Sequence, residues 1–260
     1  MLTITEMLQA QRSGTLTSRA LVQQFLAAAE ENKRLNAISE INPEAFAEAG
    51  TLDASKDKSA ALHGIPILVK DNIDVAGMVT GAGSLALTRN VAQADADIVR
   101  LLRAAGAVIL GKTSMTEFAN YMADDMPNGY SSRGGQVLNL FAPEADPSGS
   151  STGSAVAVGA GLCAAAVGTE TCGSIVSPTQ YAGVIGIKPT VGLISNRGIL
   201  PISFTLDTVG PMARCADDAR ILLGVLAGKT AATRAPCEAC MTAVMLENIQ
   251  FSLSREQKSA

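Results

Sequence analysis

Residues 95–111 read DADIVRLLRAAGAVILG, and the character of this stretch changes at Gly106. Before the glycine, apolar residues recur at helical spacing and predict a helix that ends near Gly106. After it, residues 107–111 form a short apolar run of the kind found in buried strands. A similar run, IPILVK at residues 65–70, precedes the stretch. Strand, helix and strand in succession predict an α/β fold whose central sheet, mixed or parallel, is covered by helices on both faces.

Other elements follow from the same patterns. Thr3 and Glu6 have capping-box spacing, so a short amphipathic helix is expected before Gly14. Apolar periodicity predicts further helices over residues 18–35, 42–56, 113–122, 155–168 and 221–227, and a strand over 183–189. We therefore divide the chain into an N-terminal helical segment (1–60) that packs on the core, a core (61–228), and a loosely attached tail (229–260) of mixed polarity.

Composition argues against several classes of protein. Of the 260 residues, 47% are hydrophobic and 17% are charged, so the chain can bury a sizeable core. A net charge of -4 without a basic run, together with few aromatic residues, argues against nucleic-acid binding. The longest weakly polar run is too short to span a membrane, and the N-terminus lacks the pattern of a secretory signal. The expected location is the cytoplasm.

The cysteines support the same location. They form an odd set without the spacing of a disulfide framework, at Cys163, Cys172, Cys215, Cys237 and Cys240. Such a set is typical of reduced thiols in the cytoplasm. Only Cys237 and Cys240 have a CxxC spacing, and without a second pair or a nearby histidine no metal site is expected there.

A serine that would need a base to become nucleophilic stands in GTETCGSIVSP, residues 168–178. Ser174 follows a Gly- and Thr-rich turn, but the only histidine is His63, and the G-x-S-x-G elbow is missing. His63 lies in the tight LHGIP turn, where a structural role is the simpler interpretation. Lys70 ends the run 65–70, where a lysine can act as a base if burial keeps it neutral. A lysine that ends a strand and points to water fits the same position.

A second loop of small residues, DPSGSSTGSAVAVGAG at residues 146–161, contains Gly149, Ser150 and Ser151. Small residues let a ligand approach the backbone closely, and the helix start that follows offers N–H groups. The loop lacks the GxxxxGK[ST] pattern of a phosphate-binding loop, and a nearby GAG lacks the acidic partner of a dinucleotide site. No nucleotide or other cofactor is therefore expected.

Four segments together resemble the amidase signature family, in order and in register: LHGIPILVKDNID (62–74), GSSTGSAVAVGAGL (149–162), VGTETCGSIVSPTQYAGVIGIKPTVGLISNRGILPIS (167–203) and LDTVGPMAR (206–214). The resemblance extends from about residue 3 to residue 228, so the core 61–228 is identified as an amidase signature core. It implies an α/β fold with a mixed central sheet and a Ser-Ser-Lys triad in place of a histidine. The triad maps onto Lys70, Ser150 and Ser174, and the spacing of the serines selects Ser150 over Ser151 as the bridging residue.

The resemblance also implies a mechanism. Neutral Lys70 would take a proton through Ser150, held on a cis peptide, while Ser174 attacks an amide carbonyl and forms an acyl-enzyme. The substrate would be a small or peptidic carboxamide, hydrolysed to acid and ammonia. Backbone N–H groups would form the oxyanion hole at Thr171, Cys172, Gly173 and Ser174. Neighbouring residues are assigned to substrate binding or to orientation of the triad, with a plain turn, capping or surface role left open: Ser131, Ser132, Arg133, Ser151, Glu170, Asp71 and Asn72.

Two departures from the family pattern leave a second hypothesis open. Cys172 stands where the family usually has Gly or Asp, and family members normally continue well beyond the length of this chain. We therefore expect either a serine amidase, acting alone, as a homo-oligomer or with a complementing C-terminal chain, or an apparently truncated, catalytically incomplete fragment that serves for binding or assembly. Within the family, residues 127–141 and 168–178 resemble the peptide-amidase-like branch more than the transamidosome subunit.

Overall fold

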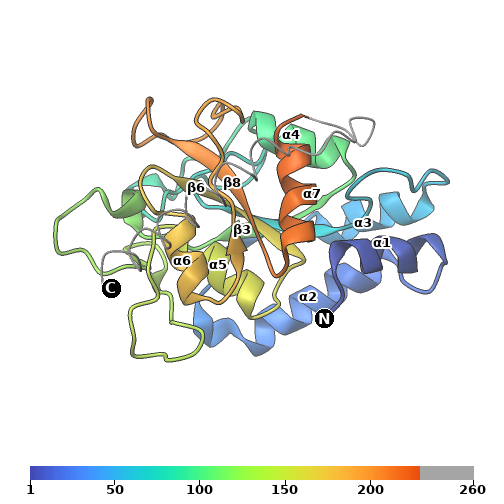
Figure 1. Cartoon of the computed structure of the whole chain (residues 1–260), viewed down its shortest axis with the longest axis horizontal. Helices are drawn as coiled ribbons and strands as arrows, with labels where there is room; N and C mark the ends of the chain where they lie inside the picture. Colours follow the sequence, from blue (N-terminus) through green and yellow to red (C-terminus); the bar gives the residue numbers. More distant parts are fainter. Residues whose placement is uncertain (229–260) are drawn as a thin grey trace, which may run out of the picture. The chain divides into compact units, whose positions relative to one another are not determined.

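Two neighbouring parallel strands form the centre of the fold. The computed structural model describes residues 1–228. Strand β2 (Pro66–Lys70) pairs in parallel with β3 (Val108–Thr113), and helix α4 (Asp97–Ala104) lies between them in the chain. Every residue of both strands is buried, because the sheet is covered on both faces. The strand, helix and strand predicted from residues 65–70 and 95–111 are confirmed (Figure 1).

The central sheet has six strands in the order β1-β3-β2-β6-β8-β7. Strand β6 (Ala165–Glu170) pairs in parallel with β2, whereas the β1–β3, β6–β8 and β7–β8 pairs are antiparallel. The other strands are β1 (Ile38–Ile41), β7 (Ile185–Gly186) and β8 (Thr208–Ala213), and β4 (Tyr130–Ser131) forms a separate hairpin with β5 (Gly135–Gln136). The predicted mixed sheet is confirmed. Because β2 and β6 run in parallel, their last residues, Lys70 and Glu170, lie at the same end of the sheet.

Helices cover both faces of this sheet. Helix α5 (Thr152–Gly159) packs on β2, β6 and β8 and on α6 (Val176–Tyr181), while α7 (Ala216–Leu226) packs on β8 and α4 (Figure 1). The N-terminal helices are α1 (Ile4–Arg12), α2 (Ser18–Glu31) and α3 (Ala45–Ala54), and short 3₁₀ turns lie at Lys33–Leu35, Leu85–Leu87 and Glu117–Asn120. The predicted capping box at the start of α1 is present, because Thr3 and Glu6 each accept the other's backbone N–H.

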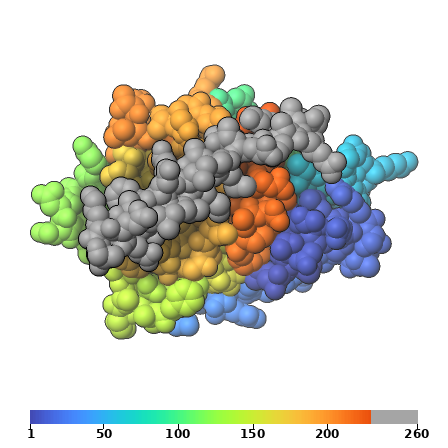
Figure 2. Space-filling model, in the orientation of Figure 1, coloured from blue at the N-terminus to red at the C-terminus, as the bar shows by residue number. Residues whose placement is uncertain are grey.

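Hydrogen bonds join the first residues of the chain to residues near the end of the described core. The N–H of Ile4 donates to Asp218 Oδ1 on α7 at 3.0 Å, and the Arg214 guanidinium donates to the Leu2 carbonyl at 3.1 Å. Figure 2 shows the blue N-terminal residues against the orange residues of α7. Residues 38–41 also contribute the edge strand β1, which the sequence patterns did not predict. Four residues are too few for a reliable pattern of strand alternation.

One predicted helix is wrong. Residues 113–122 form the end of β3 and a 3₁₀ turn in which Phe118 and Ala119 have positive φ angles of 42° and 55°. The backbone amides here bond to neighbouring loops, since Thr116 N donates to the Ser150 carbonyl and Phe118 N to the Ala82 carbonyl. Tertiary hydrogen bonds thus replace the i to i−4 bonds that the apolar pattern predicted.

A second predicted helix is correct only in its first half. Residues 155–168 were expected as one buried helix, but α5 ends at Gly159 and β6 begins at Ala165. Gly161, with a φ of 72°, reverses the chain between them. A run of small apolar residues fits a buried helix and a buried strand equally well, so periodicity alone could not separate the two.

Three further predictions concern a strand, the tail and membrane spans. Of the strand predicted over 183–189, only the short β7 forms. The tail 229–260, with Cys237 and Cys240, lies outside the described residues. Among the described residues, no helix combines the length and the apolar character that a membrane span requires.

Candidate active site

The buried end of β2 places Lys70 among hydroxyl and carbonyl oxygens. Its side chain is completely inaccessible to solvent. The Nζ atom lies 2.8 Å from Ser150 Oγ, 2.9 Å from Thr169 Oγ1 and 3.2 Å from the Thr169 carbonyl oxygen. The sequence left two interpretations open, a Lys70 side chain that points to water and one that is buried. The structure shows the buried one.

Burial changes the acidity of this lysine. Desolvation lowers the pKa of Lys70 from its ordinary value of 10.5 to about 7, although the negative charges of Asp207 and Glu170 act in the opposite direction. Near pH 7, Lys70 is therefore neutral in a substantial fraction of the molecules. A neutral amine has two N–H donors and one lone pair. The three contacts fit the protonated form, in which three N–H groups donate, and also the neutral form, in which two N–H groups donate to Thr169 and the lone pair faces the Ser150 hydroxyl.

The loop before α5 presents Ser150 to the lysine. Ser150 is fully buried, the peptide bond between Gly149 and Ser150 is cis, and the Ser150 carbonyl accepts the N–H of Thr116 at 3.1 Å. A side chain on Gly149 would come within 2.5 Å of Thr116 Oγ1. The glycine is thus needed for the close approach of this loop to the segment after β3.

Ser174 lies in the turn between β6 and α6, and its residue is 9% exposed. Its carbonyl accepts the Ser151 N–H at 3.1 Å, which joins the turn to the Ser150 loop. Within residues 1–228, its hydroxyl makes no hydrogen bond to Ser150. The structure therefore brings Lys70 and Ser150 into direct contact and places the Ser174 turn beside them through the backbone.

The backbone of this turn carries N–H groups that have no acceptor among residues 1–228. In the part of the chain that the structure describes, none of the backbone N–H groups of residues 171–174 donates a hydrogen bond. The next two, of Ile175 and Val176, both donate to Glu170 Oε2, at 2.7 and 3.0 Å. Gly173 has a φ of 90°, a conformation that favours glycine. Free N–H groups in such a turn can bind a negatively charged oxygen.

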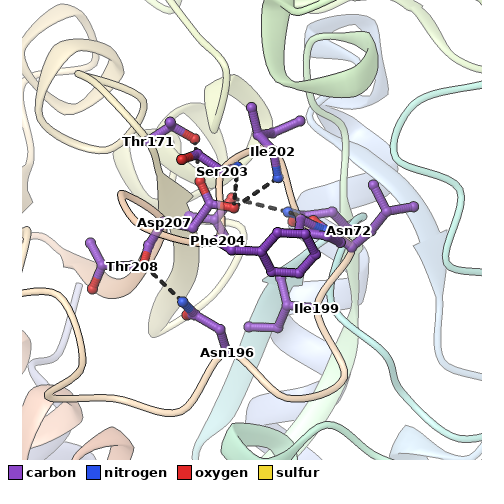
Figure 3. Close-up of a pocket in the computed structure, with 12 residues that line it drawn as sticks. Asn72, Thr171, Asn196, Ile199, Ile202, Ser203, Phe204, Asp207 and Thr208 are labelled. Carbon is purple, nitrogen blue, oxygen red and sulfur yellow. Dashed lines mark hydrogen bonds between the residues drawn. The ribbon is translucent and has the colours of Figure 1, made fainter.

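A cavity of about 100 Å³ opens next to Thr169 and Thr171 (Figure 3). Its other wall is the loop 196–208, which contributes apolar residues such as Ile199, Ile202 and Phe204. Asn72 donates to Thr169 Oγ1 at 3.1 Å and to the Leu200 carbonyl at 3.4 Å, so its amide ties the loop to the partner of Lys70. Lys70, Ser150 and Ser174 do not line the cavity, and Thr169 is the lining residue that contacts Lys70 Nζ.

Two residues around Lys70 were missed by the sequence analysis. Thr169 supplies two of the three Lys70 contacts, and Asp207 is a half-buried carboxylate on the cavity wall. Both lie in segments that carried the family resemblance, GTETCGS and LDTVGPMAR. That resemblance could have pointed to them, but their contacts with residues far away in the sequence could not be read from it.

The remaining predicted residues form a supporting layer. Ser151 Oγ bonds to the backbone of Thr169, and Glu170 bonds to the start of α6. Ser131 is buried and accepts the Gly134 N–H.

Arg133 and Ser132 connect loops at the edge of the site. Arg133 pairs with Asp71 at 2.6 Å and with Glu40 at 2.9 Å, and Ser132 accepts the Leu85 N–H. These contacts hold loops and strands together.

The single histidine stands apart from this cluster. His63 is buried, its carbonyl accepts the amide of Gln11, and burial lowers the pKa of its ring. Its predicted structural role agrees with these contacts. Cys172 has an exposed side chain in the Ser174 turn. No cluster of three or more metal-ligating side chains occurs among residues 1–228.

Comparison with known proteins identifies the family. The family model described as Amidase matches residues 20–255. A solved peptide amidase from Stenotrophomonas maltophilia is 47% identical, with a TM-score of 0.85, over 88% of this chain and 48% of that one. A probable amidase of Arabidopsis thaliana is 45% identical over 82% of this chain and 43% of its own length. A glutamyl-tRNA(Gln) amidotransferase subunit of Deinococcus radiodurans is 39% identical over 87% of this chain and 46% of its own length.

These matches favour the peptide-amidase-like branch, since the peptide amidase is more similar to this chain than the amidotransferase subunit is. The chain spans about half the length of the relatives that it matches. The fold, the order of the motifs and the family match lead to one conclusion: this chain belongs to the amidase signature family.

Proposed function

We propose that this chain hydrolyses amides with Ser174 as the nucleophile and neutral Lys70 as the base that acts through Ser150. One observation carries the proposal. A completely buried lysine with a pKa of about 7 lies 2.8 Å from a buried serine hydroxyl. A lysine with this pKa can accept a proton near neutral pH, which an exposed lysine cannot do to a useful extent.

The proposed reaction has two halves. The Ser174 oxygen attacks the amide carbonyl carbon while its proton passes to Ser150 and the Ser150 proton passes to Lys70. The free N–H groups of residues 171–174 then bind the resulting oxyanion. The C–N bond breaks as the proton returns through Ser150 to the departing nitrogen, which leaves an acyl ester on Ser174. Water attacks this ester and gives its proton to the relay of Ser150 and Lys70, the bond between the acyl carbon and the Ser174 oxygen breaks, and the proton returns to that oxygen as the acid is released.

The proposed substrate is a small or peptidic carboxamide, converted to an acid and ammonia. Support comes from the similarity to a peptide amidase and from the cavity beside Thr169. The cavity walls combine apolar side chains with polar groups at a few positions, as small-molecule sites commonly do. The proposed reaction uses no cofactor. We place the protein in the cytoplasm as part of the same proposal.

A complementing chain or a second copy is part of the proposal. The relatives are about twice as long as the segment that matches them, and one of them is named as a subunit of an amidotransferase. The second hypothesis, a catalytically incomplete fragment, has one observation in its favour. Ser174 makes no hydrogen bond to Ser150 within the described residues, so completion of the relay would need a rotation of the Ser174 side chain or a movement of the turn.

Labelling with a fluorophosphonate separates the two hypotheses, since the reagent reacts with a serine only when a base activates it. The purified chain is compared with Ser174→Ala, Lys70→Ala and the exposed control Ser13→Ala, and size-exclusion chromatography is run on the same samples. We expect labelling of the wild type and of Ser13→Ala, and none of the other two. A folded, monodisperse chain that is not labelled contradicts an autonomous enzyme.

A further inference from the structure

Asp207 connects the two walls of the cavity. Its Oδ1 accepts the Thr171 hydroxyl at 2.6 Å, and its Oδ2 accepts the N–H groups of Ile202 and Ser203 at 2.8 and 3.0 Å (Figure 3). Its carbonyl accepts the Asn196 side chain at 2.8 Å. The residue therefore binds the turn that carries Ser174 and, at three points, the loop that forms the opposite wall.

Two carboxylates bond to the two ends of the Ser174 turn. Glu170 takes the N–H groups of residues 175 and 176, which follow the turn. Asp207 takes the hydroxyl of Thr171, which begins it. Between these two anchors, the N–H groups of residues 171–174 have no acceptor within residues 1–228. Without the Asp207 anchor, Thr171 would be free to turn these donors toward other acceptors.

We propose that Asp207 is a positioning residue, which acts through Thr171 on the oxyanion-binding turn and through its charge on Lys70. This inference rests on the proposed function. It gives one carboxylate two separable effects: a tether that fixes the geometry of the turn, and a negative charge that stabilises protonated Lys70. The tether affects the rate at every pH, whereas the charge affects the pH at which the rate rises.

The charges around Lys70 make the second effect measurable. The negative charges that raise its pKa against desolvation are those of Asp207, which has the larger effect, and Glu170. From the neighbouring strand, Lys112 bonds to backbone carbonyls, and Asp71 pairs with Arg133, so both are engaged elsewhere. If the neutral amine is the active form, loss of the Asp207 charge lowers the pKa and moves the acid limb of the rate profile to lower pH.

Two variants separate the tether from the charge. Asp207→Asn keeps the size of the side chain and removes the charge, and Thr171→Val removes the bond to the turn but keeps the charge. For Asp207→Asn, we expect the acid limb of kcat/KM for a peptide amide to move down by on the order of 0.5 pH unit. For Thr171→Val, we expect kcat to fall about tenfold at the plateau while the limb stays in place. Asp217→Asn, on the exposed side of α7, is the charge control and keeps the wild-type profile.

A merely structural Asp207 would lower the melting temperature of Asp207→Asn without moving the limb, and that result overturns the inference while the proposed function stands. If the wild type neither hydrolyses amides nor binds a fluorophosphonate, the proposed function fails instead. Hydrogen exchange then still tests the tether. Residues 171–176, which include the bonded N–H groups of residues 175 and 176, should exchange at least several-fold faster in Thr171→Val than in Asp217→Asn, and equal exchange in the two variants overturns the tether.

Discussion

The surroundings of two buried lysines differ in a way that separates a candidate base from a structural cation. Lys70 and Lys112 lie on the adjacent parallel strands β2 and β3, where Lys112 is aligned with Val69, and both are completely inaccessible to solvent. Desolvation lowers the pKa of each, to about 7 for Lys70 and to about 8 for Lys112. Burial and a lowered pKa are therefore common to both.

The oxygens around the two ammonium groups differ. Lys112 bonds to the backbone carbonyls of Ile73 and Val79, which can only accept hydrogen bonds. Several charged side chains surround it, and three of these, Asp71, Asp74 and Glu40, favour its protonated form. Lys70 instead contacts the Ser150 hydroxyl, which can donate a proton to a neutral amine. A buried lysine becomes a candidate base only where a donor faces its lone pair.

The largest expected effect belongs to Lys70→Met. Loss of the base should reduce fluorophosphonate labelling and amide hydrolysis by on the order of 10³-fold or more. The exposed control Lys33→Met should behave like the wild type. Labelling of Lys70→Met at the wild-type rate would show that Lys70 is not the base, and that it does not differ from Lys112 in this respect.

Stability gives the same variant a second readout. The folded-state pKa of Lys70, about 7, lies below its ordinary value of 10.5, so the unfolded chain binds more protons between these two pH values. Unfolding free energy of the wild type should therefore rise with pH across this window, and this contribution should be absent in Lys70→Met. Urea denaturation at several pH values measures the difference.

A different result is expected for Lys112→Met. The substitution leaves the carbonyls of Ile73 and Val79 without their donor, and the acidic neighbours lose a positive charge. We expect the free energy of unfolding to fall by about 2 to 4 kcal/mol, as measured by urea denaturation. The folded fraction should still be labelled, with the rise of the rate near pH 7 unchanged. A shift of that rise would assign Lys112 a part in the proton transfer.

The smallest of these effects is expected for Thr169→Val, which removes one of the two hydroxyl oxygens that Lys70 contacts. The lysine keeps the Thr169 carbonyl and Ser150 but loses one partner at 2.9 Å, and Asn72 loses one acceptor. We expect kcat/KM to fall about tenfold. Thr205→Val, at an exposed position, serves as the control. Unchanged kinetics would show that Thr169 does not orient the lysine.

Residue patterns were enough to predict the centre of the fold. The helix and strand at residues 95–111 and the strand at 65–70 were predicted correctly, because local periodicity and a glycine stop describe such elements well. The helix predicted over 113–122 was wrong because hydrogen bonds to distant loops set its backbone. The helix predicted over 155–168 proved to be part helix and part strand, since small apolar residues fit both.

The candidate site divides in the same way. The sequence by itself predicted one site with Lys70, Ser150 and Ser174, because the resemblance to the family carries these residues in fixed order. It could not decide whether Lys70 is buried, and it did not indicate Thr169 or Asp207. Those features depend on contacts between β2, β6 and the loop 196–208, which are far apart in the chain. The sequence therefore determined which residues belong together, whereas the folded sheet determined their burial, their partners and the pKa of Lys70.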